Sequence, residues 1–168
     1  KYFGNPKLDL VYDVAHNVAK IEEHNVDGRR ERLYVHRKGA TRAFGPSRKE
    51  LPQAYRDVGQ PVLIPGSMGT PSYVLCGSDQ ALDLTFGSAC HGAGRIMSRS
   101  QAKKTFAGQD IKATLGRQGI KVKATHPAML AEEAPQVYKP SNEVVEVVND
   151  LGIATKVAKL VPLGVSKG

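Results

Sequence analysis

Apolar and polar residues alternate in the first part of the chain, as in an extended backbone. The segment from Leu8 to Ile21 predicts a β-strand; apolar residues at helical spacing fit it too, but its β-branched content favours the strand. His16 shares the apolar face of that strand and Asn17 points the other way. A lone histidine in this position is more typical of a hydrogen-bonded core residue than of a ligand. Asp27-Gly28 then predicts a turn.

Short segments of strand and helix character follow, separated by glycine and proline. The helices have recognisable ends: Ser98 or Ser100 is a candidate N-cap, and Gly119 and Gly152 follow the last periodic residues of two others. A loop between two prolines is expected at 132–140. The expected strands are 33–37, 61–64, 72–76, 120–124 and 153–165, and the expected helices are 50–58, 98–106, 109–118 and 141–151.

This order of elements predicts an α+β fold of mixed short strands with three or four helices. The 168 residues, 40% of them hydrophobic, are enough for one compact unit with a real core, and no internal repeat, low-complexity tract or linker interrupts them. No apolar run approaches 18 residues, so no membrane association is expected. Because the chain begins with Lys1 rather than Met, we expect it to be a segment of a longer polypeptide.

The net positive charge of the chain indicates the class of partner that it binds. The 24 Lys and Arg residues exceed the 16 Asp and Glu residues by eight, and the pI is near 9.6, which favours a polyanion such as nucleic acid. The densest basic segment, Arg29 to Arg42, is either a solvated surface or a track for RNA phosphates. The two cysteines, Cys76 and Cys90, form no secreted framework, so a reducing, cytoplasmic location is expected.

The segment Ser88–Arg95 carries the strongest chemical signal. His91 lies among small residues, glycines at 92 and 94 let another group approach the backbone, and Arg95 offers a planar set of donors to a phosphate. This combination suits a histidine that contacts a phosphoryl group. The alternative is a glycine-rich turn that holds a satisfied histidine.

A second loop, residues 65–70, follows the expected strand at 61–64. It contains Gly66, Gly69 and the hydroxyls of Ser67 and Thr70, a composition typical of an anion-binding nest of backbone amides. The loop lacks the Gly-Lys-Ser/Thr ending of a Walker A motif. On its own it is a weak signal for phosphate binding, and an ordinary turn is the better interpretation.

Several stretches taken together resemble the RtcB-type RNA-splicing ligases, and they occur in that family's order. The resemblance covers the C-terminal portion of such an enzyme. It implies that residues 1–168 belong to a larger single catalytic domain, whose N-terminal part, with an Asp, a Cys and two His metal ligands and an Asn-His-Phe-type motif, is absent from this chain. The stretches are Asp13–Asn17, His36–Arg42, Pro65–Thr70, Ser88–Arg95, Glu132–Asn142 and Pro162–Gly168.

The resemblance implies a GTP- and Mn²⁺-dependent RNA ligase that joins RNA 3′-phosphate or 2′,3′-cyclic phosphate ends to 5′-hydroxyl ends, as in tRNA splicing and RNA repair. His91 corresponds to the nucleophilic histidine that forms a histidine–GMP intermediate, and His16 to a manganese ligand. Tyr138 corresponds to a residue that stacks on guanine and Lys167 to one that hydrogen-bonds the base. The other implied nucleotide contacts are Asn17, Pro65, Gly66, Ser67, Met68, Ser72, Gly92, Ala93 and Gly94.

The implied partners are RNA, as tRNA halves or broken ends, and the missing N-terminal part of the same protein; whether an activating protein is needed stays open. The isolated segment is expected not to ligate. Ser47 departs from the Gly-Pro-Gly of many relatives and affects the shape of that loop alone. Two alternatives remain: a non-catalytic basic RNA- or anion-binding module, and a metal-dependent phosphotransferase with another acceptor. A binding module would tolerate the loss of His91, whereas a ligase would not.

Overall fold

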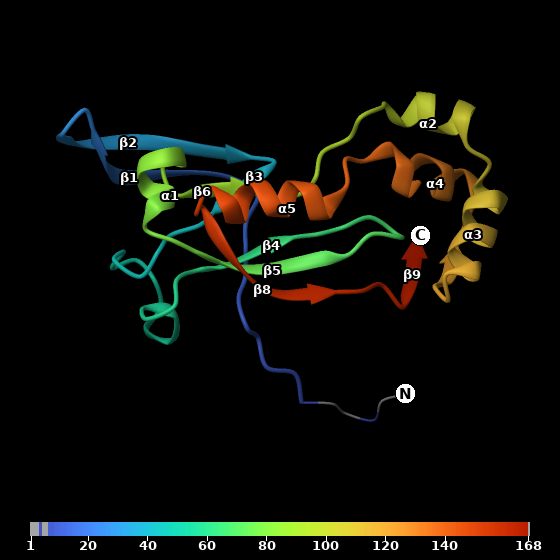
Figure 1. The fold of residues 1–168 in the computed structure, drawn as a ribbon, viewed down its shortest axis with the longest axis horizontal. Helices are drawn as coiled ribbons and strands as arrows, with labels where there is room; N and C mark the ends of the chain where they lie inside the picture. The colour runs from blue at the N-terminus through green and yellow to red at the C-terminus, as the bar shows by residue number, and fades with distance from the viewer. Residues whose placement is uncertain (1–3, 5–6, 168) are drawn as a thin grey trace.

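The computed structural model describes residue 4 and residues 7–167 of the chain (Figure 1). The α+β class expected from the sequence is confirmed, with five α-helices and nine strands among these residues. The strands are β1 (Asn17–Val26), β2 (Arg29–Lys38), β3 (Ala40–Arg42), β4 (Pro61–Ile64), β5 (Ser72–Gly77), β6 (Ser88–Cys90), β7 (Lys121–Ala124), β8 (Ala154–Leu160) and β9 (Gly164–Lys167). The helices are α1 (Gln80–Thr85), α2 (Arg99–Thr105), α3 (Gly108–Arg117), α4 (Pro127–Glu132) and α5 (Ser141–Asp150), and short 3₁₀ turns occupy Gln53–Tyr55 and Pro135–Val137.

A long antiparallel hairpin, β1–β2, lies at one end of the molecule (Figure 1). Asp27 and Gly28 form its turn with φ angles of 50° and 78°, the left-handed pair that matches the twist of a two-residue hairpin. Asn17 pairs with Lys38 at the other end, so the hairpin closes beside the short antiparallel pair β3–β6. The turn predicted at 27–28 is therefore present.

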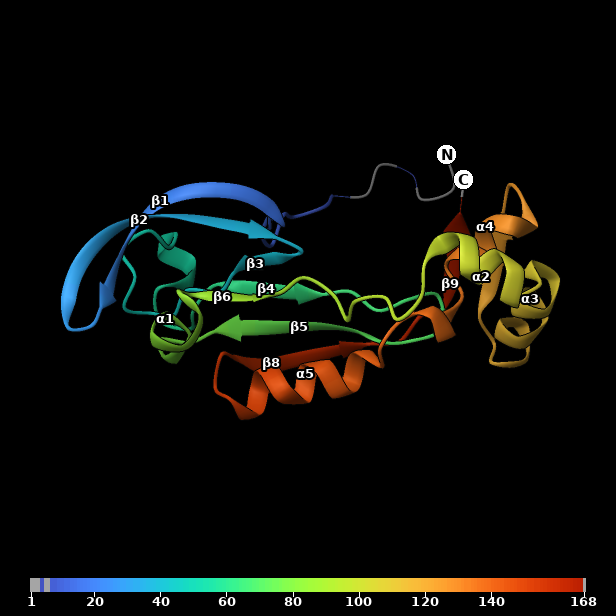
Figure 2. The same cartoon turned by 90° about the horizontal axis from the view of Figure 1, so that it is seen from above.

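The middle of the molecule is the antiparallel sheet β4–β5–β8, which α5 accompanies along its length (Figure 2). Alternate residues of β4 and β5 point into a first hydrophobic core with the apolar face of α5, and β8 contributes Ala154 to it. Gly152 ends α5 with a φ of +67°, as expected of a glycine after the last helical turn. The core contains Ala43, Val62, Ile64, Tyr73, Leu75, Ala81, Ala89, Val145, Val148, Ile153 and Ala154.

Helices α2, α3 and α4 form the opposite end, together with the parallel pair β7–β9 (Figure 2). Ser98 caps α2 by accepting a hydrogen bond from the Gln101 amide, and Gly119, with a φ of +79°, follows α3. These helices share a second core of Met68, Ala102, Ile111, Leu115, Ile120, Leu130, Ala134 and Val137. Met68 belongs to the loop after β4, so this loop connects the two cores.

A buried ionic cluster fixes the hairpin to the rest of the fold. The Arg37 guanidinium, 1% exposed, donates to both carboxylate oxygens of Glu22 at 2.7 and 2.9 Å, and His24 hydrogen-bonds the same carboxylate at 3.0 Å. Arg37 also donates to the Ser88 hydroxyl at 2.9 Å and to the Phe86 carbonyl at 2.9 Å. The cluster therefore joins β1 and β2 to the chain that leads into β6.

Four predicted boundaries were wrong. The strand predicted at 33–37 is longer and extends over Arg29–Lys38, because all of these residues pair with β1. The strand predicted from Leu8 to Ile21 begins at Asn17, because no strand of the described chain lies opposite residues 8–16 and their alternation stays unpaired. The helix predicted at 50–58 shortens to a 3₁₀ turn after Pro52, which offers no amide hydrogen. The strand predicted at 153–165 divides into β8 and β9, because the chain turns after β8 at Pro162 and then pairs with β7.

Candidate functional site

His91 and His16 lie face to face although 75 residues separate them in the chain. Their imidazole rings stack with centroids 4.2 Å apart and planes inclined by 10°. The backbone of Gly39 links the two: its amide donates to the His16 carbonyl at 3.0 Å, and its carbonyl accepts from the His91 amide at 3.1 Å. The pairing of β3 with β6 brings His91 to this point, because Ala40 lies opposite Cys90.

The environment of His91 favours a neutral ring. Burial, followed by the charge of His16, lowers the pKa of His91 below its ordinary value. The Nδ1 atom of His91 is buried and has no hydrogen-bond partner among the described residues. Buried polar atoms are normally paired, so this one indicates that a further group belongs beside the ring. A neutral imidazole with a free ring nitrogen is suited to act as a nucleophile.

A cavity of about 540 Å³ adjoins the turn that follows His91. Ten of the nucleotide contacts predicted from the sequence line it, and they come from four separate segments of the chain. Its size is in the range of small-molecule sites. These lining residues are Pro65, Gly66, Ser67, Met68, Ser72, Gly92, Ala93, Gly94, Tyr138 and Lys167.

Two of these segments are held together by backbone pairing. The turn at 92–95 runs antiparallel to residues 137–139: Arg95 and Tyr138 form a β-bridge, and the Lys139 amide donates to the Gly94 carbonyl at 3.0 Å. Gly94 has a φ of +81°, a conformation that glycine adopts without strain. Tyr138 therefore reaches the cavity beside the glycines that follow His91.

Arg95, Glu133 and Tyr138 form a cluster at the cavity wall. The guanidinium lies 5.0 Å from the centre of the Tyr138 ring and donates to the Tyr138 hydroxyl at 2.9 Å, and that hydroxyl donates to the Glu133 carboxylate. Arg95 also donates to the carbonyls of Met97 and Glu132. The structure thus uses Arg95 to fix the Tyr138 ring, whereas the sequence suggested a phosphate ligand.

The charges around Glu133 keep it ionised. Burial by itself raises its pKa, but the hydrogen bonds from Tyr138 and Arg99 and the charges of Arg95 and Lys167 hold the pKa below the ordinary value. Burial and the neighbouring Glu133 carboxylate raise the pKa of Tyr138, so the phenol stays protonated and can donate.

The loop at 65–72 is shaped by hydroxyl side chains. The Gly66 amide donates to the Ser72 hydroxyl at 3.0 Å and the Ser67 amide to the Thr70 hydroxyl at 2.7 Å. A Cβ at Gly66 would lie 2.3 Å from the Thr70 and Pro71 carbonyl oxygens, so the close turn requires glycine. Two amides of the expected nest are thus bonded within the loop itself.

The remaining predicted site residues lie outside the cavity lining. His16 and Asn17 are exposed at the start of β1. His91 immediately precedes Gly92, the first cavity-lining residue of that turn. Sequence reasoning missed Glu133, Lys139 and Ser141, which also line the cavity. Glu133 precedes Tyr138 by five residues, and the 3₁₀ turn at 135–137 between them brings the two side chains into contact. The sequence pattern contains no signal for this contact.

The described residues supply part of a metal site at most. Nowhere between residues 7 and 167 do three His, Cys, Asp or Glu side chains gather as metal ligands would. His16, the metal ligand that the resemblance implies, therefore stands without two further such side chains beside it among the described residues. In the part of the chain that the structure describes, every helix is too short or too polar to span a membrane.

Comparison with known proteins decides the family. The sequence model of the family described as tRNA-splicing ligase RtcB matches residues 1–168. The chain belongs to the RtcB family. The resemblance found in its motifs is thereby confirmed.

Three relatives, each named tRNA-splicing ligase RtcB, show the extent of the match. The protein from Archaeoglobus fulgidus is 64% identical over 161 residues, which cover 96% of this chain and 33% of the relative. That from Pyrococcus horikoshii is 55% identical over 165 residues, covering 98% of this chain and 19% of the relative. That from Pyrobaculum aerophilum is 50% identical over 173 residues, covering all of this chain and 36% of the relative. The chain thus spans 36% or less of these RtcB proteins.

Proposed function

We propose that this chain is the C-terminal part of the catalytic domain of an RNA ligase and that it binds GTP and provides the nucleophile, His91. The observation that carries the proposal is that the cavity adjoins His91. Ten predicted nucleotide contacts line this cavity, and three of them, at 92–94, directly follow His91 in the chain. Membership of the RtcB family supports the same function.

Each wall of the cavity suits one part of the nucleotide. The Tyr138 ring offers a face on which guanine stacks, worth about 1–3 kcal/mol per base. Lys167, which has donors alone, suits the O6 atom of guanine and disfavours the amino group of adenine at that place. The hydroxyls of the loop at 65–72, those of its amides that are not bonded within the loop, and the glycines at 92–94 are proposed to hold the phosphates.

The proposed reaction proceeds through His91. A neutral ring nitrogen attacks the α-phosphate of GTP, a P–N bond forms, and pyrophosphate leaves with the electron pair of the broken P–O bond. An oxygen of the RNA 3′-phosphate then attacks the phosphorus of the GMP, and the P–N bond breaks with its electron pair returning to His91. Where the RNA end is a 2′,3′-cyclic phosphate, water first opens the ring by breaking the P–O2′ bond, which leaves the 3′-phosphate and a 2′-hydroxyl. The RNA 5′-hydroxyl, losing its proton, finally attacks the activated 3′-phosphate, and GMP leaves with the electron pair of the broken P–O bond. Mn²⁺, when bound, would offset charge repulsion at the phosphates, and His16 would supply one of its ligands.

The proposed substrates are RNA ends, as tRNA halves or broken RNA, and the proposed location is the cytoplasm. The proposed partner is the N-terminal part of the same protein, which would bring the remaining metal ligands. Since the described residues hold fewer than three such ligands in one place, the isolated chain should bind nucleotide without ligating RNA.

Intact mass measurement tests the proposal. The full-length parent protein is incubated with GTP and Mn²⁺, and the mass is expected to rise by one GMP. His91→Ala should abolish the adduct, whereas His126→Ala, an exposed histidine that precedes α4, should keep it. An adduct that persists in His91→Ala would reject the role of His91. Absence of an adduct with the wild type would favour a binding module without catalysis.

A further inference from the structure

Gly39 contacts both histidines of the site through its backbone and has no side chain of its own. Its N–H holds the carbonyl of His16 at 3.0 Å and its C=O holds the N–H of His91 at 3.1 Å. We propose that Gly39 is a positioning residue that sets the relative placement of these two imidazoles. This inference rests on the proposed function, in which His91 is the nucleophile.

The requirement at this position concerns backbone conformation, not space. Gly39 has a φ of +67°, in the left-handed region, where a β-branched residue is strongly disfavoured. A Cβ placed there would meet no atom within 4 Å. A Cβ is therefore accommodated, yet a β-branched residue drives φ toward negative values and reorients the two peptide groups that bond the histidines.

His16 depends on this glycine more than an ordinary strand residue would. The segment before it, residues 7–15, has no strand or helix, and β1 starts at residue 17. Besides the Gly39 bond, the Thr41 hydroxyl donates to the carbonyl of Ala15 at 3.0 Å. The residues immediately after β2 thus hold the end of a segment that pairs with no strand among the described residues. The other hydrogen bond to this segment, from the Tyr55 hydroxyl to the Val11 carbonyl, lies five residues before His16. The position of the His16 ring on His91 therefore depends on the bonds from Gly39 and Thr41.

His91 depends on Gly39 from the other side. Its strand, β6, has three residues, and the pairing with β3 ends where Ala40 faces Cys90. The His91 amide then bonds to the Gly39 carbonyl, one residue beyond that pair. A change of φ at residue 39 moves this carbonyl and leaves the His91 amide without its acceptor. A displacement of about 1 Å at a reacting group can slow a reaction about 100-fold.

The nucleotide cavity is separate from this link. Gly39 does not line it, and its walls come from residues 65–72, 92–94, 133–141 and 162–167. A positioning role therefore predicts a slower reaction of bound GTP with little change in GTP affinity. General damage to the fold would instead weaken binding and stability together.

The experiment compares three variants of the full-length parent protein. Gly39→Val should lower the rate of GMP adduct formation at saturating GTP about 100-fold, by the misplacement argument above, while the dissociation constant for GTP changes little. Gly39→Asn, a residue that tolerates the left-handed region, should restore most of the rate. Gly119→Val is the strain control: its φ is +79°, a Cβ there also meets nothing within 4 Å, and it follows α3 outside the cavity lining.

Three results would overturn the inference: equal rates for Gly39→Val and Gly119→Val, a parallel loss of GTP affinity and thermal stability in Gly39→Val, or failure of Gly39→Asn to recover. If Gly39→Val does not fold, Gly39→Asn still decides, because a wild-type thermal midpoint with a rate about 100-fold below that of the wild type contradicts the backbone explanation. A wild-type protein that forms no GMP adduct would instead reject the proposed function, so the two failures are distinguishable.

Discussion

Lys167 enters the cavity from β9, where its backbone pairs in register with Ala124 of β7 and its carbonyl accepts from the Thr125 amide at 3.0 Å. Its ammonium charge is one of the influences that lower the pKa of Glu133. The end of the cavity that is proposed to bind the base therefore carries both a cationic donor and an anionic acceptor, a combination that would match the O6 and N1–H edge of guanine.

We expect Lys167→Ala to reduce GTP affinity while leaving ATP affinity almost unchanged, because the lost donor faces the one edge that distinguishes the two bases. A hydrogen bond to a charged group contributes about 1.5–3 kcal/mol, so the GTP dissociation constant should rise about 10- to 150-fold. Isothermal titration of the full-length protein with each nucleotide measures it. Lys112→Ala, an exposed lysine of α3, is the control; an unchanged preference for GTP over ATP would count against the role of Lys167.

The sequence alone identified candidate site residues where one side chain or one turn has a distinctive composition. His91, the glycines after it and the loop at 65–70 stood out by composition. Tyr138 and Lys167 emerged through family resemblance, because an isolated tyrosine or lysine has no local signature. Glu133 was missed for the same reason: its function depends on contacts made across the fold.

Elements were predicted well where a cap or turn residue marked their ends, as at Ser98, Gly119 and Gly152. They were missed where they were short: α1 and α4 have six residues each, too few for a helical period to show. The alternation at 8–16 was a real pattern without a partner strand. Pairing partners are long-range information, which a local pattern does not contain.

The hairpin and its buried ionic cluster provide a prediction about pH. Burial raises the pKa of Glu22, but its bonds to Arg37 and His24 and their charges outweigh this and hold the pKa below 4.5. Because the folded pKa is lower than the unfolded one, the stabilisation is complete above pH 4.5 and declines as pH falls through the folded pKa. Glu22→Gln, which leaves Arg37 without a counter-charge, should cost about 3–5 kcal/mol at neutral pH.

Thermal unfolding of the wild type and of Glu22→Gln, followed from pH 7 to pH 3, measures the stability that the ionised Glu22 contributes. The difference in midpoint should be large at pH 7 and should shrink toward pH 3. Glu50→Gln is the matched control. Burial raises the pKa of Glu50, but Arg48 outweighs this and holds the pKa below its ordinary value. The Arg48–Glu50 pair is more exposed than the Arg37–Glu22 pair, so it should contribute about 0–1 kcal/mol to stability. Equal losses in both variants at pH 7 would contradict the importance of the buried cluster.

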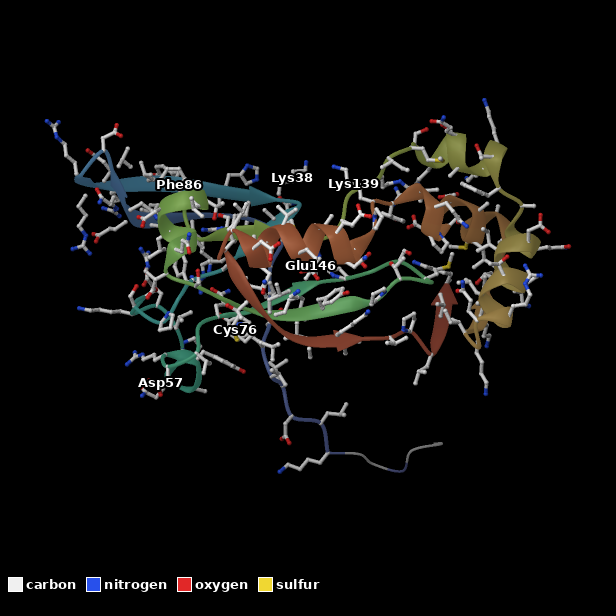
Figure 3. All side chains as sticks on the ribbon, viewed as in Figure 1. Lys38, Asp57, Cys76, Phe86, Lys139 and Glu146 are labelled. Carbon is white, nitrogen blue, oxygen red and sulfur yellow. The ribbon has the colours of Figure 1, made fainter. Side chains whose placement is uncertain are left out.

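At the scale of the whole molecule, the basic residues of the β1–β2 hairpin lie unequally on its two faces. One face of β1–β2 is buried against the fold and holds Arg37, so this arginine is unavailable to RNA. The outward face of β2 is exposed throughout and carries Arg30, Arg32 and Lys38; Figure 3 shows Lys38 at the end of the hairpin nearer to the helical half of the molecule. The basic track predicted at 29–42 is thereby reduced to this outward face.

We expect replacement of Arg30, Arg32 and Lys38 by Gln to flatten the salt dependence of single-stranded RNA binding. Each phosphate contact contributes about 0.7 to the slope of log K against log salt, so three contacts account for about 2. The control removes the same charge from the helical end, at Lys104, Lys112 and Arg117, and should leave the slope as it is. Equal slopes for the two triple variants would show that the hairpin face does not bind RNA.

The cavity also has a consequence for synthesis of the protein. Its walls come from four stretches of chain spread over about a hundred residues, and the last of them is β9. Chains fold from the N-terminus as they are made, and contacts distant in sequence form late. A nascent polypeptide can therefore pair β4 with β5 and present His91 well before the cavity proposed to bind the nucleotide is complete. A ribosome stalled before residue 164 would carry this histidine beside a cavity that lacks its last wall.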